Sequence, residues 1–87
     1  MRHLRLARPL VVFDLETTGT DVDKDRIVQI GLIRVEPDGG RRSWEHLVNP
    51  ERPIPPEATA VHGIRDEHVR DEPTFAQLRA EIEQWFA

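Results

Sequence analysis

A short apolar run, interrupted by one carboxylate and followed by another, is the clearest pattern in the chain. It covers residues 10–15 and includes Asp14, and Glu16 comes directly after it. A continuous apolar run of this length is typical of a strand buried on both faces in the middle of an α/β sheet. Because side chains alternate along a strand, Asp14 and Glu16 are expected on the same face.

Two like charges on one face of a buried strand repel each other and lose hydration. The pair is tolerated if one carboxylate is protonated, if cations pair with both, or if divalent ions lie between them. Mg²⁺ and Mn²⁺ favour carboxylate oxygen, so Asp14 and Glu16 form a candidate metal site. The alternative is a solvated strand end or a helix cap.

Thr17, Thr18 and Gly19 follow the pair. Two hydroxyls and a glycine predict a tight polar loop whose backbone N–H groups can approach an anionic ligand closely. The alternative is an ordinary turn in which Gly19 supplies a positive φ and the threonines satisfy the backbone.

The segment of residues 19–26 is polar and acidic, with Asp21, Asp23 and Asp25 at alternating positions. This alternation suggests a calcium-binding loop, but an EF-hand also needs a glycine at its sixth position and a distant glutamate. Neither is in place, so a solvated loop is predicted.

Two further strands are predicted, joined by a hairpin. Residues 27–35 are mostly apolar and β-branched, and residues 41–48 return after the turn sequence Glu-Pro-Asp-Gly-Gly. Gln29 is expected to hydrogen-bond locally, and His46 is expected to be a surface or half-buried residue rather than a ligand.

Helical signals occupy the rest of the chain. Prolines stiffen residues 49–56, and a short helix is predicted over residues 56–61, closed by Gly63. Thr74 and Gln77 have capping-box spacing, and apolar residues follow at helical intervals. The last helix is therefore expected to pack one apolar face against a sheet.

The predicted architecture is an α/β fold that opens with a three-stranded antiparallel meander followed by helices. A buried first strand needs neighbours on both sides, whereas a meander gives it only one. The fold is therefore expected to be incomplete.

Composition narrows the classes of function. The net charge of −4 argues against a broad basic surface for nucleic acid, but not against a nuclease that meets phosphates through divalent cations. The absence of cysteine excludes disulfides, a thiol nucleophile and a cysteine zinc site, and suits a cytoplasmic protein. Residues 1–9 form a basic N-terminal extension, without an apolar run long enough for a signal peptide or a membrane span.

The sequence Phe-Asp-Leu-Glu-Thr-Thr-Gly, residues 13–19, resembles the first exonuclease motif of the DEDD 3′–5′ exonucleases. This family, in its DEDDh branch, includes the proofreading epsilon subunit of DNA polymerase III. Four further segments resemble the family in the same order: residues 25–31, 47–50, 54–56 and 60–64. The resemblance covers nearly the whole chain from residue 10 onward.

The resemblance implies a ribonuclease H-like exonuclease fold, of which residues 10–87 would be the N-terminal half. It also implies hydrolysis of phosphodiester bonds at the 3′ end of DNA with two divalent cations, Mg²⁺ or Mn²⁺. Asp14 would ligate both cations, and Glu16 would ligate one.

For the substrate, the resemblance implies that Thr17, Thr18 and Gly19 line the terminal nucleotide, largely through main-chain groups. His62 would contact the same nucleotide, with a structural role at the end of the short helix as the alternative. The implied partners are a single-stranded or frayed 3′ end of DNA and a DNA polymerase subunit, with no membrane.

The family motif also requires two later aspartates and a general-base histidine, and this sequence has none of the three in the required context. The chain alone is therefore expected to be an inactive part of a longer domain. Two alternatives remain: an RNA 3′–5′ exonuclease of the same superfamily, and a non-catalytic interaction module. In the module, exposed strand edges would form a protein interface or a homodimer.

Overall fold

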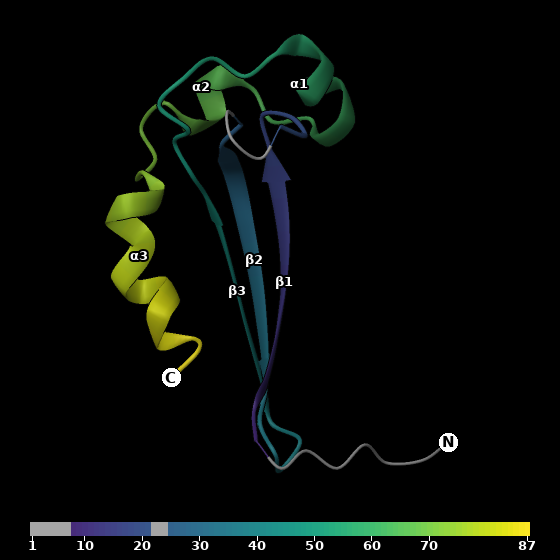
Figure 1. Ribbon diagram of the computed structural model, residues 1–87, viewed down its shortest axis with the longest axis vertical. Coiled ribbons are helices and arrows are strands. Elements are labelled where there is room, and N and C mark those ends of the chain that lie inside the picture. The colour runs from purple at the N-terminus through teal and green to yellow at the C-terminus, as the bar shows by residue number, and fades with distance from the viewer. Residues whose placement is uncertain (1–7, 22–24) are drawn as a thin grey trace.

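The structure, a computed structural model, describes residues 8–21 and 25–87 (Figure 1). In these residues an antiparallel sheet of strands β1 (Leu10–Thr17), β2 (Ile27–Val35) and β3 (Arg41–Leu47) has the order β1-β2-β3. The predicted meander is confirmed, and β1 continues two residues beyond its predicted end. The predicted N-terminal extension, apart from its last two residues, lies outside the described residues, as does Asp23.

A tight turn joins β2 to β3 at the end of the sheet far from the first two helices (Figure 1). Gly39 has a φ of 92°, in the left-handed region that favours glycine, and its N–H donates to the Glu36 carbonyl at 2.9 Å. Asp38 Oδ1 accepts from the Gly40 N–H at 2.8 Å. The hairpin predicted from the turn sequence is therefore present.

Helix α3 (Phe75–Gln84) lies along one side of the sheet (Figure 1). It begins with the predicted capping box: the Gln77 N–H donates to Thr74 Oγ1 at 3.3 Å, and the Thr74 N–H donates to Gln77 Oε1 at 2.9 Å. Its apolar face packs on the sheet in one buried cluster of Ile30, Leu32, Val48, Leu78 and Ile82. None of the helices in the described residues is long and apolar enough to span a membrane.

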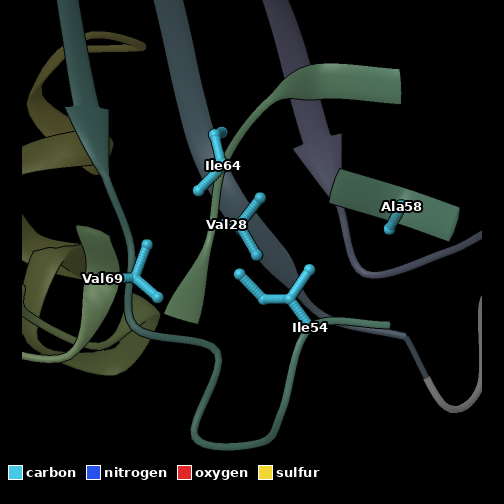
Figure 2. Close-up of a cluster of buried hydrophobic side chains, with 5 residues drawn as sticks. All are labelled: Val28, Ile54, Ala58, Ile64 and Val69. Atoms are coloured by element: carbon cyan, nitrogen blue, oxygen red, sulfur yellow. The ribbon is translucent and has the colours of Figure 1, made fainter. Parts of the chain in front are cut away.

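Helices α1 (Pro56–His62) and α2 (Asp66–Val69) lie across the end of the sheet at which β1 ends (Figure 1). Gly63, with a φ of 76°, ends α1 as predicted. A second buried cluster packs around the start of β2 and beneath these helices (Figure 2), and it consists of Val28, Ile54, Ala58, Ile64 and Val69. This packing holds the C-terminal end of α1 beside the end of β1.

Strand β1 differs from its prediction, because it is an edge strand rather than a buried one. Among the described residues it pairs with β2 alone, and four of its five apolar side chains are exposed, with Phe13 at 59%, while Val11 is half-buried. The expectation of burial on both faces was wrong for this chain, whereas the expectation that a meander gives β1 only one neighbouring strand is confirmed. Whether the exposed edge forms a homodimer stays a prediction.

Candidate active site

Asp14 and Glu16 lie on the face of the sheet that α3 leaves uncovered. In the register of the sheet, Asp14 is opposite Gly31 and Glu16 is opposite Gln29, whereas the alternate residues of β2 face α3. Asp14 is exposed and Glu16 is half-buried. In the described part of the chain, neither carboxylate has a hydrogen-bond or ion-pair partner. Both are therefore available to bind a cation.

A hollow of about 360 Å³ lies beside Asp14, over the centre of this face. Gly31 lies within its lining, and a Cβ placed there would have only the Asp14 carbonyl oxygen within 4 Å, at 3.8 Å. Glu45 of β3 lies on the other side of Gly31. The hollow thus gives a ligand access to the Asp14 side of the carboxylate pair.

Glu45 does not complete a metal site with the pair. Its Oε1 accepts a hydrogen bond of 2.7 Å from Gln29 Nε2, which is the local bond expected of Gln29. Within residues 8–21 and 25–87, no group of three or more His, Asp or Glu side chains could hold a metal ion. The described residues therefore supply two carboxylates, which is fewer than two divalent cations require.

Thr18, two residues after Glu16, is buried, with a 2% exposed fraction, and its hydroxyl forms hydrogen bonds within the protein. Thr18 Oγ1 donates to Asp25 Oδ1 at 2.7 Å and accepts from the Arg26 N–H at 2.9 Å. The Thr18 N–H donates to the Arg26 carbonyl at 2.8 Å. The side chain of Thr18 therefore joins the end of β1 to the residues directly before β2.

Position 19 needs a glycine because there is no room for a side chain, and not because of its φ angle. The positive-φ glycines among the described residues are Gly39 and Gly63. A Cβ at Gly19 would instead lie 2.5 Å from Asp25 Oδ2, inside van der Waals contact. The loop also contains two local bonds: the Thr17 hydroxyl donates to the Gly19 carbonyl, and the Gly19 N–H donates to Thr17 Oγ1 at 3.3 Å.

His62, at the end of α1, is hydrogen-bonded to this loop. Its Nδ1 accepts from the Ile64 N–H at 3.0 Å, so in the neutral ring the proton is on Nε2. That Nε2 lies 3.0 Å from the Thr17 carbonyl oxygen and donates to it. The structure thus brings His62 to the predicted site residues but occupies both of its nitrogens with main-chain groups.

Asp25 is the residue that the sequence analysis missed. It was assigned to a solvated loop, yet it accepts from the Thr18 hydroxyl and from the Asp21 N–H, the latter at 2.8 Å. These two bonds hold the pKa of the Asp25 carboxyl below its usual range, and the bond from Thr18 lowers that pKa the most. The available signal was an aspartate two residues before the second strand, but its contact partner Thr18 lies seven residues earlier in the chain.

Comparison with known proteins identifies relatives over nearly the whole chain. A family model described as "Exonuclease" matches residues 11–87. A DNA polymerase III subunit epsilon-like protein of Rhodobacter capsulatus is 47% identical over 73 residues, which cover 78% of this chain and 10% of that protein. The DNA polymerase III epsilon subunit of Escherichia coli K12 is 36% identical over 81 residues, covering 83% of this chain and 32% of the subunit.

Solved structures agree with the sequence relatives. Exonuclease X in complex with 5′ overhanging duplex DNA is 34% identical, with a TM-score of 0.72 over 83% of this chain and 42% of that chain. Escherichia coli exonuclease I in complex with a dT13 oligonucleotide, at 24% identity and a TM-score of 0.76, shares the fold over 91% of this chain and 18% of its own. The fold is therefore the ribonuclease H-like exonuclease fold in part, and the chain spans about a third of the epsilon subunits it matches.

Proposed function

The chain belongs to the exonuclease family, and from that premise we propose that it is the N-terminal half of a metal-dependent 3′–5′ exonuclease domain. Residues 10–87 would carry the first pair of metal ligands. The length supports this proposal, because the chain spans about a third of its epsilon-type relatives. A half-domain with two carboxylates is expected to be inactive alone, since removing part of a catalytic unit costs nearly as much as removing all of it.

The observation that carries the proposal is the position of Asp14 and Glu16. They share one face of β1, are within reach of solvent, and have no protein partner among the described residues. Carboxylate oxygen is the donor that Mg²⁺ and Mn²⁺ prefer, so the chemistry of the two side chains fits these ions. Asp14 would ligate both ions and Glu16 one. When bound, such ions activate water and stabilise charge on the phosphodiester oxygens.

The substrate proposed for the complete domain is the single-stranded or frayed 3′ end of DNA. The relative of known structure that is 34% identical was solved with duplex DNA, which supports DNA over RNA. The main chain of Thr17, Thr18 and Gly19 would line the terminal nucleotide. His62 would contact it through its ring carbons, since both ring nitrogens are engaged. The epsilon-type relatives support a DNA polymerase subunit as a partner.

Calorimetric titration of the folded chain with Mn²⁺ tests this proposal. The wild-type chain is expected to bind Mn²⁺, and the double variant Asp14→Ala/Glu16→Ala is expected to lose that binding. Glu45→Ala is the matched control, because Glu45 is a carboxylate on the same face of the sheet but two strands away. Binding unaffected by the double substitution, or no binding by the folded wild-type chain, would overturn the assignment of the pair as a preformed half-site.

A further inference from the structure

Asp25 makes a different kind of contact from an ordinary turn aspartate. Asp38 in the β2–β3 hairpin shows the ordinary kind, since it accepts from the Gly40 N–H two residues later. Asp25 accepts instead from the hydroxyl of Thr18, which is buried and lies seven residues earlier in the chain, at the end of β1. Its second oxygen accepts from the Asp21 N–H. One carboxylate therefore binds two residues of the connection that leaves β1, its first residue Thr18 and Asp21.

Asp25 and Gly19 also depend on each other sterically. A Cβ at Gly19 would lie 2.5 Å from Oδ2, 2.8 Å from Cγ and 3.0 Å from Oδ1 of Asp25. Because two hydrogen bonds hold that carboxylate, it cannot turn aside without breaking them. Because Gly19 has no side chain, the Asp25 carboxylate can occupy the position beside it.

We propose that Asp25 is a positioning residue for the proposed active site. It fixes the main chain of residues 17–19, the loop directly after Glu16, by binding Thr18 and by filling the space beside Gly19. The inference rests on the proposed function, since it assigns these residues to the loop that would line the terminal nucleotide. Asp25 itself touches neither the ions nor the nucleotide.

Amide hydrogen exchange, measured residue by residue by NMR, tests the hydrogen bonds. Asp25→Asn replaces one acceptor oxygen by an N–H₂ group and removes the charge, so the side chain can no longer accept from both the Thr18 hydroxyl and the Asp21 N–H. We expect the exchange rates of the Thr18, Asp21 and Arg26 amides to rise at least tenfold, while amides between β2 and β3 stay unchanged. Asp38→Asn is the matched control and should leave all of these rates at their wild-type values. Unchanged loop rates, or a uniform rise across the sheet, would overturn the proposal.

Substitutions at Thr18 separate positioning from loss of charge. Thr18→Val removes the hydroxyl at nearly constant shape and keeps the Asp25 charge, whereas Thr18→Ser keeps the hydroxyl. We expect Thr18→Val to reproduce the faster loop exchange and to shift the side-chain carboxyl ¹³C resonance of Glu16. Thr18→Ser is expected to leave the exchange rates and the Glu16 resonance at their wild-type values. A Glu16 resonance that Thr18→Val leaves unmoved would show that Asp25 serves the turn alone.

A double-mutant cycle tests the space beside Gly19. In the wild-type background, Gly19→Ala is expected to speed exchange in the loop as much as Asp25→Asn does. In the Asp25→Ala background, which removes the obstructing carboxylate, Gly19→Ala is expected to add less than a twofold change. Additive effects would refute the steric part of the proposal. None of these measurements uses metal or nucleotide. A failure of Mn²⁺ binding would therefore overturn the proposed function without affecting these tests of Asp25.

Discussion

Truncating Ile64 tests whether the cluster beneath α1 and α2 holds the site together. Ile64 has a 7% exposed fraction and packs with Val28, Ile54 and Val69. Ile-to-Ala changes in cores cost about 2–5 kcal/mol, from lost burial and the cavity left behind. A chain of 87 residues has a total stability of about 4–13 kcal/mol at the usual average per residue. We therefore expect Ile64→Ala to remove a large share of the stability.

Urea unfolding followed by tryptophan fluorescence measures this effect. Trp44 and Trp85 have ring centroids 6.3 Å apart and pack against the other cluster, so they report unfolding without direct contact with the mutated one. Val61→Ala is the control, because Val61 lies three residues before Ile64, in α1, and is 84% exposed; it should change stability by no more than about 0.5 kcal/mol. A loss below about 1 kcal/mol for Ile64→Ala, or equal losses for both variants, would refute the packing of this buried cluster as described.

Three further predictions use the same unfolding assay. The folded-state pKa of Asp25 lies below its ordinary value of 3.8, so the ionised carboxylate stabilises the fold above pH 3.8, and this stabilisation is lost as the pH falls through the folded pKa. Between pH 6 and pH 2 the wild type should therefore lose more stability than Asp25→Asn. Parallel plots of stability against pH for the two proteins would contradict this. The double variant Asp14→Asn/Glu16→Gln should be at least as stable as the wild type, because it removes two like charges on one face of a strand; a loss above about 0.5 kcal/mol would mean that the carboxylates have stabilising partners. Thr74→Ala should cost about 1 kcal/mol through loss of the α3 cap, with the exposed Thr20→Ala as a neutral control; equal midpoints for the two variants would argue against the cap.

Local signals in the sequence predicted most of the secondary structure. The turn before β3 was predicted because Gly39 and its neighbours form a hairpin signal, and the structure has Gly39 at a positive φ. The start of α3 was predicted because Thr74 and Gln77 satisfy a rule that spans only four residues. Alternation along β1 likewise predicted that Asp14 and Glu16 share a face.

The remaining features depend on contacts between distant parts of the chain. The exposure of β1 depends on which strands lie beside it, and an apolar run does not contain that information. The bond between Thr18 and Asp25 spans seven residues and requires two strand ends to meet. His62 donates to a carbonyl 45 positions earlier, a contact that exists because α1 packs across the end of the sheet.

The exposed edge of β1 has a consequence for the solubility of the chain. Long apolar edge strands are templates for aggregation, and proteins commonly protect them with charged side chains. Asp14 and Glu16 are the charged residues of β1, so the carboxylates proposed to bind cations are also expected to oppose aggregation through this edge. A bound divalent ion would neutralise them. Concentrated solutions of the chain are therefore expected to turn cloudy as Mn²⁺ is added and to clear when a chelator removes it.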